Sequence, residues 1–306
     1  MTAIPQTNGP GLPAERQGAA FIGLVLGATA MGISPVFVRL AEIGPFASAF
    51  WRVALALPLL WAWMRLETGE TRLADLLPSD RLVLLAGSLF AGDLFFWHLA
   101  ILNTTVANAT FLAAIAPLAV LVGAWLMLGE AITARMVYGM LLSIAGAALL
   151  LGSSYRYAPE NLTGDIFGLI TACFFAAYFL AVRPVRKRLG TGQVIFQSSV
   201  VTAALLLVVA LVSGEGFVPE SRSGIMALVA LALISHAGGQ GLLAFALGHL
   251  PAGYSSLVIF LEGVAAAFFG WLLLDEGLGG LQWAGCALIV LSIFLSRPRR
   301  RAEAGR

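Results

Sequence analysis

The sequence predicts an all-α membrane protein with ten transmembrane helices in two inverted five-helix repeats. Three observations predict this class: the apolar composition, ten apolar runs of spanning length, and one offset that relates the two halves of the chain. Hydrophobic residues make up 59% of the 306 residues and charged residues only 11%. Soluble domains contain about 45–50% apolar and about 25% charged residues, so lipid is the expected solvent for most of this surface.

Ten apolar runs reach the length of about 20 residues that a helix needs to cross a bilayer. They cover residues 18–40, 46–65, 82–102, 105–127, 133–152, 164–183, 192–213, 224–248, 252–273 and 280–296. Turn and breaker residues such as Gly44-Pro45 separate them. Helices are the expected spanning elements, because membrane β-barrels show alternating segments of about ten residues instead.

Two tails are expected to flank the predicted spans. Residues 1–17 are expected to form a disordered tail and residues 297–306 a basic one. The first apolar run is too long for the core of a signal peptide, so we interpret it as a spanning helix.

With the N-terminus inside, 14 of the 18 Lys and Arg residues fall on the cytoplasmic side and 3 outside. This bias predicts cytoplasmic termini in a bacterial-type inner membrane.

The two halves of the chain are related by a single offset. Glu130 aligns with Glu276, and 276 − 130 = 146. We therefore expect a first repeat over residues 18–152 and a second over residues 164–296. Because each repeat contains five spans, an odd number, the repeats must face opposite ways across the bilayer. Inverted repeats recur in transporters, whose substrate site lies near the midplane between the repeats.

The fourth and ninth predicted spans carry a family resemblance. The first copy contains Ala116-Pro117-Leu118 and ends at Leu128-Gly129-Glu130, and the second contains Leu261-Glu262-Gly263 and ends at Leu274-Asp275-Glu276. With Phe50-Trp51-Arg52 in the second span, this pattern resembles the ten-helix EamA-type members of the drug/metabolite transporter superfamily. The resemblance implies a metabolite transporter, more often an exporter than an importer. Gly263 stands where the family commonly has a proline, which puts a proline kink of the ninth span in question.

Ionisable residues inside the predicted spans are candidate functional residues, because a charge at the bilayer centre costs about 2.5–3.5 kcal/mol on insertion scales. Asp93 and Glu262 lie near the centres of the third and ninth spans. Either can carry a proton, and Asp93 can also bind a substrate ammonium. Arg52 can bind an anionic group of the substrate. In the structural alternatives, Arg52 is a counter-ion that pairs with Asp93, and Glu262 makes a hydrogen bond between helices.

A second group of residues would shape a polar cavity walled by aromatic rings. His236 and Gln240 lie four residues apart on the eighth span, so one helix face presents both; the alternative is a hydrogen bond between helices. The glycines at 238, 239 and 241 are predicted to loosen this span. The remaining candidates for substrate binding are Trp97, Asn108, Phe111, Tyr178 and Tyr254. Such a cluster suits a zwitterionic or aromatic metabolite, although each aromatic can also pack against lipid.

The leading interpretation is a secondary transporter that exports a small polar or amphipathic metabolite, such as an amino acid, by alternating access with proton coupling or exchange. The sequence has no Gly-Lys-Ser/Thr phosphate-binding motif, so ATP is not expected to drive it directly. A lipid carrier and a membrane-embedded enzyme are the alternatives. The adjacent Ser235 and His236 point to different helix faces, which argues against a serine protease.

No cofactor, metal site or nucleic-acid partner is expected. The two cysteines, Cys173 and Cys286, are isolated within apolar runs and match neither a disulfide framework nor a zinc site. The expected partners are a small-molecule substrate, membrane lipids and, in a homodimer, a second copy of the chain.

Overall fold

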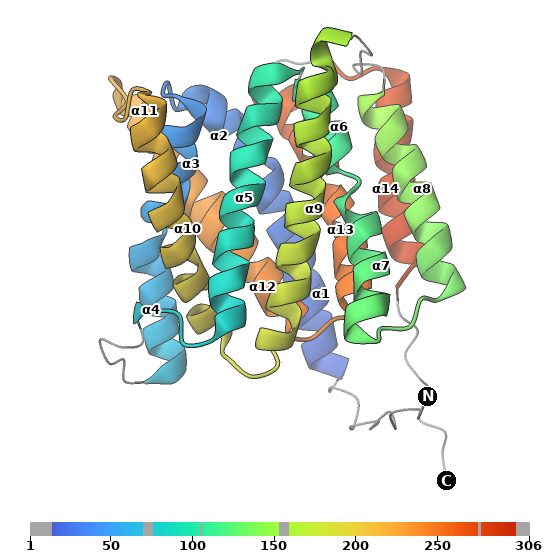
Figure 1. The fold of residues 1–306 in the computed structure, drawn as a ribbon. Coiled ribbons are helices and arrows are strands. Elements are labelled where there is room, and N and C mark those ends of the chain that lie inside the picture. Colours follow the sequence, from blue (N-terminus) through green and yellow to red (C-terminus); the bar gives the residue numbers. More distant parts are fainter. Residues whose placement is uncertain (1–13, 70–75, 105, 153–158, 275–276, 298–306) are drawn as a thin grey trace.

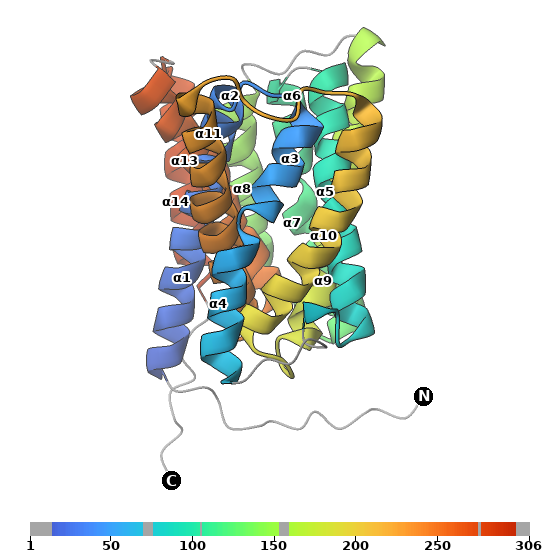
Figure 2. The same ribbon diagram turned by 90° about the vertical axis from the view of Figure 1, so that its left-hand side faces the viewer.

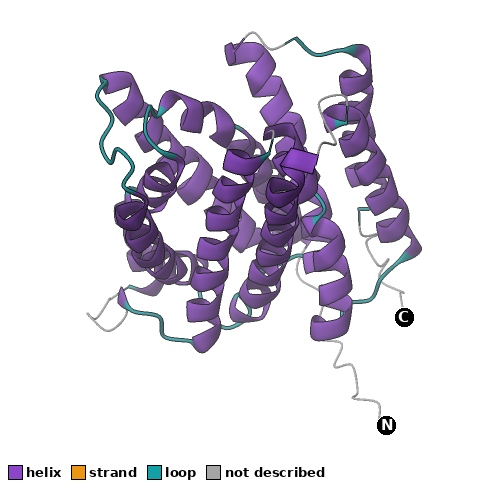
Figure 3. Ribbon diagram, turned by 45° about the horizontal axis from the view of Figure 1, so that its top comes forward, coloured by secondary structure: helices purple, strands orange, loops and turns teal. Residues whose placement is uncertain are grey.

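The computed structural model of the chain describes residues 14–69, 76–104, 106–152, 159–274 and 277–297. These residues form a helical bundle that contains no β-strand (Figures 1 and 3). The first half contains α1 (Ala14–Gly32), α2 (Ser34–Leu40), α3 (Pro45–Ala54), α4 (Leu57–Thr68), α5 (Arg81–Asn103), α6 (Val106–Ala113), α7 (Ala116–Leu128) and α8 (Ala134–Leu151). The second half contains the short 3₁₀ turn η2 (Pro159–Asn161), α9 (Leu162–Val185), α10 (Thr191–Ser213), α11 (Arg222–Ala230), the π-helix η3 (Leu231–Gln240), α12 (Gly241–Leu247), α13 (Ala252–Leu274) and α14 (Gly280–Leu295).

The predicted transmembrane fold is confirmed. Within the described ranges, nine helical segments are long and apolar enough to cross a membrane, and α14 is a tenth, shorter apolar helix. At 1.5 Å per residue, the 16 residues of α14 extend about 24 Å. A bilayer core of about 30 Å can thin locally to match such a helix. The chain is therefore a multi-pass membrane protein.

Three of the five spans of the second repeat begin at the predicted offset from their counterparts in the first. α10 begins 146 residues after α3 (191 − 45), α13 begins 146 after α6 (252 − 106), and α14 begins 146 after α8 (280 − 134). In Figure 1, α1 runs upward from the face at which α14 ends, whereas its counterpart α9 runs downward toward that face. The repeats are therefore inverted. We call the face where α1 begins and α14 ends the terminal face, and the opposite one the far face.

Prolines break three spans of the first repeat. α2, α4 and α7 each carry a proline at the start, namely Pro35, Pro58 and Pro117. Proline lacks a backbone N–H and its ring clashes with the preceding turn, so the helix is interrupted before it. Figure 2 shows the break between α3 and α4. At the equivalent positions, 146 residues later, the second repeat has Ala181, Ala204 and Gly263.

The equivalent helices α9, α10 and α13 of the second repeat are continuous. The proline kink that Gly263 put in question is thus absent from the ninth span.

The eighth span contains a feature that sequence reasoning did not predict. Between α11 and α12 the backbone forms the π-helix η3, a conformation that is rare over this length and recurs at functional sites. The glycines predicted to loosen this span also allow close packing. A Cβ atom placed on Gly27 of α1 would lie 3.0 Å from the carbonyl oxygen of Gly239, and such contacts require small residues.

The ends of the chain differ slightly from the prediction. The first helix begins at Ala14, four residues before the predicted span. The rest of the predicted tails, residues 1–13 and 298–306, lies outside the described residues.

Candidate functional site

A cavity of about 150 Å³ lies between the two repeats, and every span except α10 contributes to its wall. The fourth and ninth spans line it with equivalent residues 146 positions apart, Ala113 with Ile259 and Ala116 with Glu262. The cavity therefore lies where the two repeats meet, as inverted-repeat transporters require. One water molecule needs about 10–15 Å³ of such space, so the cavity accommodates roughly ten water-sized groups, which is the size of an amino acid.

The cavity occupies the half of the bundle away from the terminal face. It is lined by Pro35, late in the first span, by Leu151 at the end of α8, and by Thr110 near the start of α6. All three positions lie toward the far face. The other half of the bundle is filled by packed side chains and by the polar contacts described below.

Three charged side chains line the cavity: Arg52, Asp93 and Glu262. Arg52 and Asp93 are each only 8% exposed, and the guanidinium of Arg52 lies within electrostatic range of both carboxylates. Among the described residues, no ion pair within 4.0 Å joins Arg52 to either acid. The Nε atom of Arg52 has no hydrogen-bond partner. The direct Arg52–Asp93 pair considered as the structural alternative is therefore not formed.

The break in the second span explains the position of Arg52. Pro58 begins the next helix, so α3 ends at Ala54 and Arg52 lies in its last turn. The C-terminus of a helix carries partial negative charge and stabilises a cation there. The local sequence thus supports a guanidinium at a depth where an isolated charge would be costly.

The structure brings together five of the predicted site residues. Arg52, Asp93, Trp97, Gln240 and Glu262 all line the cavity. They come from α3, α5, η3 and α13, so both repeats supply them.

His236 and Tyr178 lie behind the cavity wall. His236 is fully buried, and its Nε2 lies 2.9 Å from Ser199 Oγ. Its ring packs 5.6 Å from that of Phe90, and the ring of Tyr178 lies 5.1 Å from the same phenyl group. Phe90 itself lines the cavity and separates both residues from it. Of the predicted pair on the eighth span, only Gln240 reaches the cavity.

Asn108, Phe111 and Tyr254 also lie outside the cavity wall. Asn108 Nδ2 donates to Asp165 Oδ1 at 3.0 Å, which ties α6 to α9 near the far face. The ring of Tyr254, near the start of α13, stacks 6.4 Å from Phe21. Substrate contact by these three, as by His236 and Tyr178, stays a prediction, since they do not share the cavity with the charged residues.

Sequence reasoning missed several wall residues. Phe90, Phe175 and Phe260 supply the aromatic surface and Thr171 a hydroxyl group. Phe90 could have been found, because it precedes Asp93 by three residues and so shares its helix face. Thr171 is a single threonine within an apolar run and carries no comparable signal.

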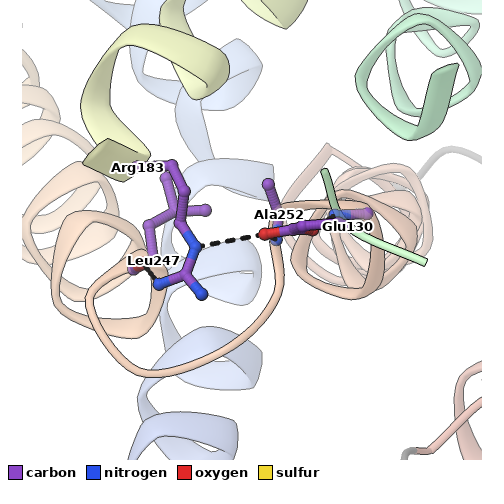
Figure 4. Close-up of polar contacts among 5 residues, drawn as sticks. Glu130, Arg183, Leu247 and Ala252 are labelled. Carbon is purple, nitrogen blue, oxygen red and sulfur yellow. Dashed lines mark hydrogen bonds and ion pairs between the residues drawn. The ribbon is translucent and has the colours of Figure 1, made fainter. Parts of the chain in front are cut away.

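A polar network closes the bundle at the terminal face (Figure 4). The carboxylate of Glu130, just after α7, accepts hydrogen bonds from the backbone N–H groups of Ala252 at 3.0 Å and Gly253 at 3.2 Å. It also accepts one from Arg183 Nε at 3.2 Å, and Arg183 Nη1 donates to the carbonyl of Leu247 at 2.6 Å. Glu130 therefore joins the ends of α7, α9 and α12 to the start of α13.

A second acid at this face, Glu67, also accepts hydrogen bonds from the start of a helix. Glu67, in the last turn of α4, accepts from the N–H groups of Thr191 and Gly192 at the start of α10, both at 2.7 Å. Carboxylates are stabilising at helix N-termini. Nearby, Arg186 donates to the carbonyl of Ala244 at 2.9 Å. Burial lowers the pKa of Arg186, and the charge of Glu67 opposes that shift.

The equivalent contact exists at the far face. Glu215, just after α10, accepts from the N–H groups of Phe46 and Ala47 at the start of α3, at 2.9 and 3.1 Å. The second and seventh spans, which are counterparts in the two repeats, therefore cap each other at both faces.

Two inverted five-helix repeats around a shared charged cavity define a class of membrane transporters. Comparison with known families agrees with this class. The model of the EamA-like transporter family matches residues 18–152 and again residues 162–297. The chain therefore belongs to the EamA-like transporter family, as its sequence resemblance indicated.

Individual relatives are also named as transporters. The chain is 29% identical over 252 residues to the pseudopaline exporter CntI of two Pseudomonas aeruginosa strains, covering 82% of this chain and 86% of the relative. It is 26% identical to an uncharacterized transporter of Archaeoglobus fulgidus, covering 87% and 92%. It is also similar in fold to a protein of known crystal structure, with a TM-score of 0.78 at 20% identity, over 92% of this chain and 96% of that one.

Proposed function

We propose that this transporter exports a small zwitterionic metabolite, such as an amino acid, in exchange for protons. The observation that carries the proposal is the cavity in which one guanidinium and two carboxylates face a space of about 150 Å³ without pairing directly. Arg52 would bind the substrate carboxylate, for which a guanidinium supplies a fork of donors. Asp93 would bind the substrate ammonium. Trp97 would cover the bound molecule.

Proton exchange would follow from competition within the cavity. With all three groups ionised, Arg52, Asp93 and Glu262 sum to −1, and a net charge at this depth is costly. A proton on Glu262 brings the sum to zero. A zwitterion adds no net charge, but Glu262 would attract its ammonium only while that carboxylate is ionised. Substrate binding and protonation of Glu262 would therefore oppose each other, which is the basis of antiport.

Alternating access would open the terminal face. The cavity lies in the far half of the bundle, while the contacts of Glu130 and Arg183 hold the terminal half together. We propose that these contacts break when the substrate site is exposed to the terminal side. The charge bias of the sequence supports the assignment of that side to the cytoplasm of a bacterial-type inner membrane. The name of the Pseudomonas relative supports the direction of export.

The test is transport by the purified protein in proteoliposomes. We expect exchange of labelled amino acids that is accelerated by an imposed pH gradient. Asp93→Asn should weaken binding of an amino acid at least tenfold while changing little the binding of its deaminated analogue, because only the ammonium contact is lost. Asp80→Asn, at a surface ion pair with Arg188, is the matched control. Equal affinity of the Asp93 variant and the wild type for the amino acid would contradict the proposal.

A further inference from the structure

Two uncharged polar side chains of the cavity wall have atoms that lack hydrogen-bond partners among the described residues. Gln240 is 1% exposed and Thr171 is 3% exposed. The Oε1 atom of Gln240 and the Oγ1 atom of Thr171 make no hydrogen bond, and both residues line the cavity. Buried polar groups are paired in nearly all proteins, and an exception needs an explanation. Here the cavity itself offers the place for a partner.

Gln240 differs from its counterpart in the first repeat in both side chain and backbone. η3 ends at this residue, and the first-repeat counterpart of Gln240 is Leu94 (240 − 94 = 146) on the regular helix α5. Leu94 lines the same cavity. The two repeats thus present an amide and an isobutyl group at equivalent positions. The polar group and the unusual backbone occur together, and only in the second repeat.

Thr171 shows the same departure from symmetry. Its counterpart is Val25 (171 − 25 = 146), a side chain of nearly the same shape without a hydroxyl group. Thr171 lies on α9, which packs against α5, α6 and α7, whereas η3 packs against α1 and α3. The two residues therefore line the cavity from different walls.

We propose that Gln240 and Thr171 form a hydrogen-bonding subsite for an uncharged polar group on the substrate side chain, such as an amide or a hydroxyl. This inference rests on the proposed function and specifies its substrate class: a zwitterion with a polar side chain and not an aliphatic one. An amide and a hydroxyl can both donate and accept, so together they match either kind of group. An aliphatic substrate would bury both groups without partners, and a site built to form hydrogen bonds discriminates strongly against such an analogue.

The experiment compares isosteric probes on the full-length protein. Binding of asparagine and leucine, and of threonine and valine, is measured by displacement of a labelled amino acid from the purified transporter. We expect the wild type to favour the polar member of each pair by at least tenfold, which equals about 1.4 kcal/mol. Gln240→Leu, which copies Leu94, and Thr171→Val should each reduce this preference about tenfold and leave leucine and valine binding unchanged.

The control is Thr29→Val, the same substitution on α1, where the hydroxyl already donates to the carbonyl of Val25 at 2.9 Å and does not line the cavity. It should keep the wild-type preference. Equal wild-type affinity within each pair overturns the inference even if no variant folds, and leaves the proposed function standing. Unchanged preference in folded Gln240 and Thr171 variants overturns it as well. Failure of every zwitterion to bind contradicts the proposed function on which it rests.

Discussion

Glu262 is the residue on which the proposed proton exchange depends. Its carboxyl group lies on the ninth span, in the cavity and within electrostatic range of Arg52. Its counterpart in the first repeat, Ala116, also lines the cavity but cannot carry a charge. Of these two equivalent positions only Glu262 is ionisable, so protonation there changes the charge of the cavity by one unit.

We expect Glu262→Gln to uncouple transport from the proton gradient. The amide is permanently neutral and nearly isosteric, so Arg52 and Asp93 still bind the two ends of the zwitterion. Substrate-for-substrate exchange in proteoliposomes should continue, whereas an imposed pH gradient should no longer accelerate uptake. Glu220→Gln, the same substitution at an exposed position between α10 and α11, is the control. A gradient response equal to that of the wild type would remove Glu262 from the coupling mechanism.

At the scale of elements, the carboxylates at helix ends hold particular spans together. Glu67 and Glu215 cap the counterpart spans at both faces of the membrane. These two contacts exist in the same structure, so the second and seventh spans are expected to move as one unit. Glu130 instead joins α7 to α13 at the terminal face only, among the described residues. Its repeat partner Glu276 lies outside them.

We expect Glu130→Ala to loosen the start of α13. The substitution removes the acceptor of the Ala252 and Gly253 amides and the partner of Arg183, and loss of a helix cap costs about 0.5–2 kcal/mol. Hydrogen exchange of residues 252–253 should accelerate about three- to thirtyfold, with smaller changes in α10. Glu160→Ala in η2 is the control, because Glu160 is exposed. Unchanged hydrogen exchange at residues 252–253 would show that Glu130 does not hold the terminal face closed.

At the scale of the whole molecule, the last spans of the two repeats pack closely against each other. A Cβ atom on Gly285 of α14 would lie 2.5 Å from the carbonyl oxygen of Gly146 on α8, and one on Gly146 would lie 2.8 Å from that of Gly285. Ser143 and Ser292 join the same helices through hydroxyl groups 2.5 Å apart. Such backbone contact is how helices associate in lipid, where no hydrophobic effect drives them together.

We expect Gly285→Ala to destabilise the bundle and reduce transport. Backbone atoms cannot move aside as a flexible side chain can, so α14 must shift away from α8 at a cost of about 1–3 kcal/mol. Thermal unfolding in detergent should occur several degrees lower. The control is Gly18→Ala on α1, where a Cβ atom meets nothing within 4 Å; it should be neutral or slightly stabilising. Equal unfolding temperatures for the two variants would contradict this account of the contact.

The sequence alone predicted the number of spans, their inverted order and the family. These are properties of chain segments: the length of an apolar run sets whether it crosses the bilayer, and an odd number of spans in each repeat forces the inversion. The offset of 146 reappears in the helix starts of α10, α13 and α14. Residues close in sequence determine where a helix starts, and the repeat places equivalent residues at that offset. Arg52, Asp93 and Glu262 were identified for the same reason, because a charge in an apolar run is visible without a structure.

Only the tertiary structure decided which of the candidates share a cavity. Gln240 reaches the cavity and His236 does not, because Phe90 from another span lies between His236 and the cavity. Thr171 joins the wall through the packing of α9, and the π-helix at Gln240 has no counterpart in the first repeat. Helix crossings, proline breaks and side-chain packing between distant segments determine these positions, and none of them is a property of one segment of the sequence.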